Sequence, residues 1–343
     1  MKLMNFLIIS LFAIISACSK GDDTPPNTNV APTNVTLSAN VSTDNSGNVT
    51  FTATATNAVN FDFDFGNGVF QTVPNGIVTY KYPSGGNYTV NVVAKSQSNL
   101  TASKSIQITV AVSSSLIFSD EFDTPGAPDP GKWGYDIGTG SGGWGNNEAQ
   151  YYTNRLDNAI VSNGTLKIIA KKENYSGSAY TSARLLSKNK FSFKYGTVEA
   201  RAKLPAGVGT WPAIWMLGDN INTVGWPACG EIDIMEHRGM ELNKIFGTVH
   251  HPGHSGGNAD GGTKVISNAT TEFHLYKMEW TATSIKFYVD GVVFYTFTNN
   301  QSVPFNHNFF LLLNFAMGGH FGGSIDPAFN TATFEIDYIR VYQ

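Results

Sequence analysis

Apolar and polar residues alternate along much of the chain, and this alternation predicts a protein built of β-strands. Side chains of a strand point to opposite faces in turn, so a period of two marks a strand with one buried face. Such segments are 49–55, 88–94, 106–110, 166–170, 196–202 and 284–289. The pair Asp290-Gly291 predicts a hairpin turn, and the longer apolar run 309–315 predicts a strand buried on both faces. Helical patterns are scarce, so we predict an all-β fold.

The strands fall into two regions. Residues 33–112 hold a few strands separated by turn residues, which predicts a small β-sandwich. Residues 116–343 hold many short strands, and their pattern fits two antiparallel sheets folded as a jelly roll. Asp, Asn, Thr and Pro dominate residues 18–32, which predicts a flexible linker, and three serines at 113–115 predict a short hinge.

The first residues have the pattern of an export signal. Lys2 supplies a positive charge, and residues 3–17 form an apolar run too short for a comfortable membrane span. The run ends in Ile15-Ser16-Ala17-Cys18, which resembles a bacterial lipobox. This resemblance implies a signal peptide over 1–17 and a lipid on Cys18 that anchors the protein to the outer membrane, at the cell surface. Ordinary signal cleavage that leaves a free cysteine is the alternative.

Composition narrows the classes of partner. The chain has 343 residues, a net charge of −4 and only 14% charged residues. It therefore lacks the excess of basic residues that nucleic-acid binding requires. Its 35 glycines and 13% aromatic residues suit a loop-rich β protein with surfaces on which ligands stack. With Cys18 lipidated, Cys229 has no cysteine partner, so we expect a buried thiol and no structural disulfide.

Three carboxylates lie within six residues of the segment 230–237, which is otherwise mostly apolar. On a strand, Glu231 and Asp233 point the same way, whereas Glu236 points the other way unless one extra residue forms a β-bulge. Three acids on one buried face are costly to desolvate, so we expect them to do chemistry. A solvated acidic edge is the alternative.

Paired carboxylates suggest glycoside hydrolysis. With a bulge between them, Glu231 and Glu236 could lie at the separation of about 5–5.5 Å that a retaining mechanism uses. We assign Glu231 as nucleophile, Glu236 as general acid/base and Asp233 as the orienting residue between them, although physics alone does not fix the order of the glutamates. Asp233 would raise a neighbour's pKa or share a proton with it. A metal site is the other use of three acids, but no histidine spacing at the motif supports a transition metal.

With these acids the chain resembles glycoside hydrolase family 16, in its laminarinase-like branch, which carries Glu-x-Asp-x-x-Glu on a bulged strand. The resemblance implies that the first glutamate is the nucleophile and the last the acid/base, without a catalytic cofactor. It also implies a concanavalin-like β-jelly roll with a cleft across the concave sheet, and it covers roughly residues 115–343. Further segments that resemble the family are 144–153, 209–217, 226–229, 247–250 and 336–342.

Aromatic platforms and a few polar groups bind sugars. Trp211 and Trp215 are four residues apart, so they share a face on one continuous strand, and Trp226 lies in a loop just before the motif. We predict that all three bind substrate, with a place in the core as the alternative for each.

Four polar residues complete the predicted binding set. The family resemblance places Asn146, Glu148 and Arg184 toward the cleft, with surface solvation as the alternative. His250 follows Thr248 at period two, so it could contact the catalytic carboxylates or the sugar, with a satisfied core histidine as the alternative.

The resemblance also implies a structural Ca²⁺ away from catalysis. Family members often bind one on the convex side, through an acid of the closing strand and backbone carbonyls, and oxygen ligands suit this ion. Asp337 matches that acid, while Glu121 and the carbonyl of Gly164 are weaker candidates. An ordinary surface aspartate is the alternative.

A second metal site is considered at His250, His251 and His254, which lie close together in the sequence. Flanking glycines and the lack of a nearby patterned carboxylate argue against it.

The N-terminal region resembles a PKD domain, an immunoglobulin-like module, in the segments 63–68, 80–82 and 86–90. It departs from the family pattern with Phe63 where a tryptophan is common and Asn67 where an aspartate is common. No catalytic constellation is apparent there, and its aromatic residues are expected in the core. We expect a spacer that holds the enzyme away from the membrane.

The leading hypothesis is a monomeric, retaining endo-β-1,3-glucanase whose partner is laminarin-type polysaccharide. A mixed-linkage β-glucanase or a marine galactan hydrolase of the same fold is the first alternative. The segments 144–148 and 226–230 favour glucan. A surface lipoprotein that only binds glycan is the second alternative, and the intact set of acids argues against it.

Overall fold

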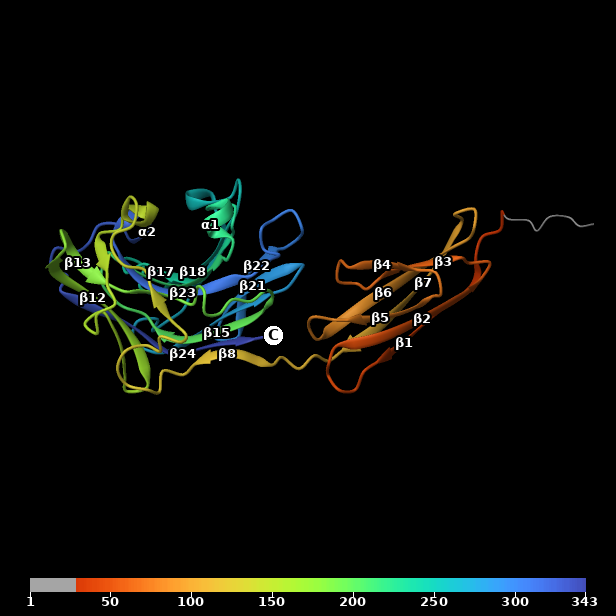
Figure 1. The fold of residues 1–343 in the computed structure, drawn as a ribbon, viewed down its shortest axis with the longest axis horizontal. Helices are drawn as coiled ribbons and strands as arrows, with labels where there is room; N and C mark the ends of the chain where they lie inside the picture. Colours follow the sequence, from red (N-terminus) through yellow and green to blue (C-terminus); the bar gives the residue numbers. More distant parts are fainter. Residues whose placement is uncertain (1–28) are drawn as a thin grey trace, which may run out of the picture. The chain divides into compact units, whose positions relative to one another are not determined.

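The computed structural model describes residues 29–343, whose contacts divide into two units that are described separately here (Figure 1). The predicted signal peptide and the lipidated Cys18 lie outside the described residues. Within the described part, no helix has the length and apolar character needed to cross a membrane.

The first unit is a small β-sandwich. Its three-stranded sheet contains, in hydrogen-bonded order, β1 (Thr33–Val41), β2 (Asn48–Thr56) and β5 (Ile77–Lys81). Its four-stranded sheet contains β4 (Phe70–Val73), β3 (Asn60–Asp64), β6 (Gly86–Lys95) and β7 (Thr101–Val110). The rings of Phe51, Phe63 and Phe65 contact one another and are fully buried. These aromatic residues therefore form the core, as predicted.

The second unit consists of two larger sheets. The seven-stranded sheet has the order β19 (Asp260–Val265), β18 (Lys244–His250), β17 (Glu231–His237), β16 (Thr210–Gly218), β23 (Phe309–Met317), β14 (Arg184–Leu186) and β9 (Gly134–Tyr135). The ten-stranded sheet has the path β10 (Gln150–Tyr152), β13 (Ser178–Ser182), β12 (Thr165–Tyr175), β24 (Thr331–Tyr342), β15 (Gly196–Lys203), β20 (His274–Trp280), β21 (Ser284–Val289) and β22 (Val292–Thr298). Two strands extend it by pairing with β12 and β24, namely β11 (Ala159–Ser162) and β8 (Leu116–Asp120).

One hydrophobic core joins the two sheets. It includes Ile232 and Leu313 from the seven-stranded sheet and Phe287 and Ile339 from the ten-stranded sheet, all fully buried. Figure 1 shows the two layers, with β17, β18 and β23 in one and β15, β24 and β8 in the other. The prediction of an all-β protein with a jelly-roll sandwich is confirmed.

Three predictions that rest on short stretches of sequence are confirmed. Asp290 (φ 49°) and Gly291 (φ 77°) connect β21 to β22, and positive φ at both positions is the geometry of a tight hairpin turn. All nine residues of β23 are buried, as the mostly apolar run predicted. Cys229 is a buried free thiol.

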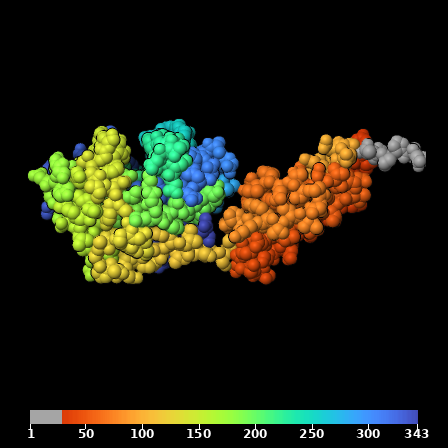
Figure 2. All heavy atoms as spheres, in the orientation of Figure 1, coloured from red at the N-terminus to blue at the C-terminus, as the bar shows by residue number. Residues whose placement is uncertain are grey.

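Four short helical turns lie between the strands of the described residues. They are η1 (Gly143–Asn147), α1 (Ile221–Val224), η2 (Gly256–Asn258) and α2 (Gly319–Gly322). Figure 2 shows the surface hollowed between the yellow segment that includes η1 and the green-to-teal segment that includes α1.

Candidate active site

Strand β17 brings its three acids to one face through a β-bulge. Along β16 the partners of Glu231, Asp233 and Glu236 are Leu217, Trp215 and Ala213, which alternate regularly, while the register shifts between Asp233 and Glu236. The predicted bulge is therefore confirmed. The apolar residues of β17, Ile232, Ile234 and Met235, are all buried in the core. Each contributes about 1.5–3 kcal/mol of burial, which helps to offset the cost of desolvating the acids.

The neighbouring strand β18 presents His250 and Thr248 to the same face. His250 lies opposite Glu231, and Thr248 lies opposite Asp233. Nε2 of His250 is 3.1 Å from Oδ2 of Asp233 and 3.7 Å from Oε1 of Glu231. Because Oδ2 of Asp233 has no aligned hydrogen-bond donor, the first contact is electrostatic. His250 thus contacts two of the acids, one of the two roles predicted for it.

A backbone group fixes which nitrogen of His250 carries the proton. The N–H of Gly256 donates to Nδ1 at 3.1 Å, so Nδ1 is the acceptor. In the neutral ring the proton is then on Nε2, which faces the carboxylates. The N–H of the neutral ring therefore lies beside the acids, without the alignment of a hydrogen bond to Oδ2 of Asp233.

Two indole N–H groups hold the two glutamates. Nε1 of Trp226 donates to Oε2 of Glu231 at 3.0 Å, and Nε1 of Trp211 donates to Oε1 of Glu236 at 2.9 Å. The hydroxyl of Thr248 adds a longer hydrogen bond of 3.4 Å to Oε2 of Glu236. Trp226 keeps 49% of its surface exposed, so its ring is available to a ligand. Each glutamate is thereby fixed in orientation beside an aromatic ring.

Burial and mutual repulsion make the acids hard to ionise. Burial, followed by the negative charge of Asp233, raises the pKa of Glu231 and the pKa of Glu236 to about 8 each. Burial raises the pKa of Asp233 well above its ordinary value. Three carboxylates this close cannot all be charged near neutrality, so at least one keeps a proton. A group that can give a proton and a group that can attack are both needed in general acid/base and nucleophilic catalysis.

Polar and aromatic side chains form a hydrogen-bonded network that begins at the N–H of Trp215. Trp215 donates to Oδ1 of Asn314 at 2.8 Å, and Asn314 donates to the hydroxyl of Tyr152 at 2.9 Å. That hydroxyl donates to Glu148 at 3.0 Å, and Asn146 donates to Glu148 at 3.3 Å. This network connects two residues of the predicted binding set, Asn146 and Glu148, with Trp215.

Arg184 lies between two aromatic rings. Its guanidinium carbon is 4.7 Å from the ring centre of Trp144 and 4.8 Å from that of Trp215, and its Nε is 3.0 Å from Asp136. Contacts of this kind contribute about 0.5–2 kcal/mol. Trp215 is thus held on one side by Arg184 and at its N–H by Asn314, which leaves it less free than Trp226 to act as a platform.

Sequence reasoning missed several residues of this face. Asn314 carried a signal, because it is the one polar residue in the apolar run 309–315. Phe321 packs against Trp211 at 5.3 Å between ring centres and against Phe246 at 5.0 Å. Phe321 and Phe246 come from segments far apart in the chain, so no local pattern could reveal that pairing.

The two carboxylates of the predicted calcium site are engaged by arginines. Arg340 binds Glu121 through two hydrogen bonds of 2.9 and 2.7 Å, and Asp337 forms an ion pair with Arg201. These carboxylates do not fall into any cluster of metal-ligating side chains among the described residues. As the side chains stand, the set does not fit a cation, because each carboxylate is already neutralised by a guanidinium.

The three histidines near the motif lie in two different places. The expectation that no carboxylate lies near them was wrong. His250 faces Glu231 and Asp233, whereas His251 and His254 both lie 3.1 Å from Oδ2 of Asp260. Pairing of β18 with β19 places Val249 opposite Asp260, which brings the carboxylate back beside the histidines. Only this register, not local spacing, could have revealed the cluster.

Comparison with known proteins gives a consistent result. Residues 146–340 match the family described as glycosyl hydrolases family 16, and residues 24–110 match the PKD domain. The β-glucanase of Rhodothermus marinus is 46% identical over 245 residues, which cover 66% of this chain and 85% of that protein. The glucan endo-1,3-beta-glucosidase A1 of Niallia circulans is 38% identical over 257 residues, which cover 66% of this chain and 38% of that protein. The X-ray structure of the laminarinase from Rhodothermus marinus matches with a TM-score of 0.64 and 46% identity, over 67% of this chain and 98% of that one.

Proposed function

This chain belongs to glycosyl hydrolase family 16, and on that premise we propose that it is a retaining endo-β-1,3-glucanase that hydrolyses laminarin-type β-glucan. The observation that carries the proposal is the pair Glu231 and Glu236 on one face of β17, each held by an indole N–H. The similar proteins are named as a β-glucanase, an endo-1,3-glucosidase and a laminarinase, so a glucan is favoured over a galactan.

In the first step, the Glu231 carboxylate attacks the anomeric carbon of the sugar. The bond from that carbon to the glycosidic oxygen breaks, and protonated Glu236 gives its proton to the departing oxygen. The N–H of Trp226 orients the attacking carboxylate, and the N–H of Trp211 orients the acid. Asp233 lies between the two and holds its carboxylate toward Nε2 of His250.

In the second step, Glu236 acts as the base. Its carboxylate takes a proton from water, and the water oxygen attacks the anomeric carbon and displaces Glu231. Two inversions leave the β-configuration unchanged. The raised pKa of Glu236 suits both roles, since the group must hold a proton in one step and accept one in the next.

A side-by-side product profile tests the substrate. We expect oligosaccharides from laminarin and much less release from lichenan and agarose. Release from lichenan or agarose in place of laminarin would support the mixed-linkage or galactan alternative. Binding to laminarin without release of reducing ends would support a glycan-binding lipoprotein.

Azide rescue tests the two roles. In Glu236→Ala, azide should restore cleavage of an activated aryl glucoside and give the β-azide, because the covalent intermediate still forms on Glu231. An α-azide would assign the nucleophile to Glu236 instead. Glu231→Ser should abolish hydrolysis and leave oligosaccharide binding intact.

We propose a structural calcium only as a site that forms by rearrangement at Asp337, Glu121 and the carbonyl of Gly164. The ion would have to displace Arg201 and Arg340 from the two carboxylates. A rise in Tm on adding Ca²⁺ to EDTA-treated protein, lost in Asp337→Asn, is the expected result. An unchanged Tm would mean that Ca²⁺ does not bind and that the two arginine ion pairs persist.

We propose that the protein is exported, anchored by a lipid on Cys18, and monomeric. The sequence pattern before Cys18 supports the first two points. Fractionation of cells that express the Cys18→Ser variant tests the anchor, since the variant should leave the membrane fraction. Light scattering of the lipid-free protein tests the monomer.

A further inference from the structure

A tight turn at the end of β18 places two imidazoles next to each other. His251 and His254 exchange two backbone hydrogen bonds of 2.9 Å each, with Pro252 and Gly253 between them. Gly253 has φ +84°, which a type II turn requires at its third position, after proline at the second. The two rings stack with centres 4.8 Å apart.

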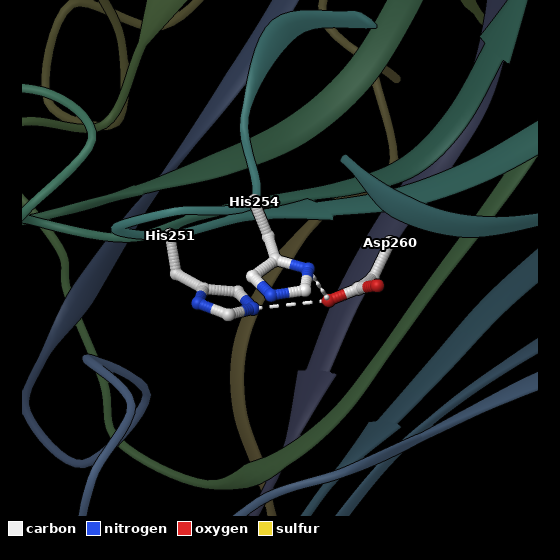
Figure 3. A group of neighbouring side chains, drawn as sticks. All are labelled: His251, His254 and Asp260. Carbon is white, nitrogen blue, oxygen red and sulfur yellow. Dashed lines mark hydrogen bonds and ion pairs between the residues drawn. The ribbon is translucent and has the colours of Figure 1, made fainter. Parts of the chain in front are cut away.

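A carboxylate completes the group from the next strand. Asp260 begins β19, and its Oδ2 lies 3.1 Å from Nε2 of His251 and 3.1 Å from Nδ1 of His254. Figure 3 shows both rings directed at this one oxygen. All three donor atoms lie within 4.8 Å of one another.

The donor set fits a tetrahedral divalent metal, and so do the two separations between an imidazole nitrogen and the carboxylate oxygen. Bonds of about 2.0 Å in a tetrahedron place neighbouring donor atoms about 3.3 Å apart, close to the two separations of 3.1 Å. Two imidazoles and one carboxylate are ligands that Zn²⁺ and related transition metals accept, whereas Ca²⁺ and Mg²⁺ prefer oxygen donors.

The surroundings hold one ligand rigidly and leave the site open to solvent. His251 is 7% exposed and packs against Phe297 and Phe305, so its ring is fixed before any metal arrives. The His254 side chain keeps 51% of its surface exposed, which gives an ion an entry path and leaves room for a water as fourth ligand.

From this geometry we propose a binding site for Zn²⁺, or a similar transition metal, formed by His251, His254 and Asp260. The site is separate from the catalytic carboxylates. His251 packs into the apolar contacts with Phe297 and Phe305, whereas His250, one residue earlier on the strand, faces Glu231. Bound metal would fasten residues 251–260, which include the Gly256 N–H that holds His250.

Calorimetric titration with Zn²⁺ and visible absorption with Co²⁺ test the site, on the full chain without a histidine tag and after dialysis against EDTA. We expect one ion per chain, visible Co²⁺ bands of a tetrahedral site, and a higher Tm with Zn²⁺. His254→Ala and Asp260→Asn should each weaken binding at least tenfold. His254 is well exposed and Asn has the shape of Asp, so both variants are expected to fold, which circular dichroism checks.

His274→Ala is the matched control. His274 pairs with a single carboxylate, Asp290, at 2.7 Å and has no second histidine beside it, so this change should leave metal affinity unaltered. Failure to saturate at one ion per chain would overturn the proposal. So would equal affinity in the wild type, His254→Ala and Asp260→Asn, because the ion would then be bound elsewhere, for example at Glu231, Asp233 and His250.

Discussion

Gly256 donates its backbone N–H to Nδ1 of His250 at 3.1 Å, and this directs the other ring nitrogen at the catalytic acids. We predict that His250→Phe, which keeps a ring but loses both nitrogens, lowers kcat on laminarin about 10- to 100-fold. That range corresponds to one lost hydrogen bond or contact to a charged group, about 1.5–3 kcal/mol.

Steady-state kinetics check this prediction, with His274→Phe on the other sheet as the control. The loss should appear in kcat more than in KM, since the ring contacts the acids. A kcat within twofold of wild type would assign His250 a merely structural role.

Trp226 combines two functions that two substitutions can separate. Trp226→Phe keeps an aromatic surface but removes the N–H that holds Glu231, so kcat should fall several-fold with little change in KM. Trp226→Ala also removes the exposed ring and should raise KM in addition. Equal KM values for the two variants would mean that the ring contributes nothing to substrate binding.

Asp233→Asn should move the alkaline limb of the kcat/KM profile to lower pH. Burial and then the charge of Asp233 raise the pKa of Glu236 to about 8. A general acid works only while it is protonated, so activity falls as pH rises through that pKa. Removing the charge lowers the pKa, and the fall then begins earlier. An alkaline limb at the same pH would show that Asp233 is uncharged in the working range.

The same raised pKa values predict that the active site destabilises the fold as pH rises. An unfolded glutamate has a pKa of about 4.5, and the folded pKa of Glu231 is about 8. Between these values the folded protein binds more protons than the unfolded chain, so the free energy of unfolding decreases as pH increases. Glu231→Gln should therefore raise Tm by about 2–8 °C at pH 8, for a gain of about 1–2 kcal/mol, and by much less at pH 5.

Thermal unfolding of the full chain at both pH values tests that prediction. An exposed acid such as Asp157, changed to Asn, serves as the control and should alter neither Tm appreciably. A lower Tm for Glu231→Gln at pH 8 would mean that the carboxylate stabilises the fold through its hydrogen bond with Trp226.

Short-range chemistry accounts for what the sequence could predict. The five-residue gap from Glu231 to Glu236 required a bulge if both served one site, and the register contains it. Period-two segments, the Asp290-Gly291 turn and the buried run of β23 also depend only on neighbours in the chain.

The rest depends on register between distant strands. The contact of Asp260 with His251 and His254 exists because β19 pairs with β18, and the ring of Phe321 reaches Trp211 only in the folded sheet. Likewise, the arginines that neutralise Glu121 and Asp337 come from other strands, so matching those acids to a calcium pattern did not reveal their partners.

The bulge in β17 also determines which face of the sheet each later residue of the strand occupies. Ile234 and Met235 are adjacent in the chain, yet both are buried in the core, and every residue after them faces opposite to where a regular strand would place it. Deletion of one of the two would leave a regular strand with the spacing Glu-x-Asp-x-Glu, in which alternation alone keeps Glu236 on the face of Glu231 and Asp233 and keeps His237 in the core. The bulge therefore does not create the pair of glutamates but absorbs one extra residue between them. A regular strand and a bulged strand can thus present the same three acids, so loss of one codon at 234 or 235 would leave every catalytic residue both in the sequence and on the site face.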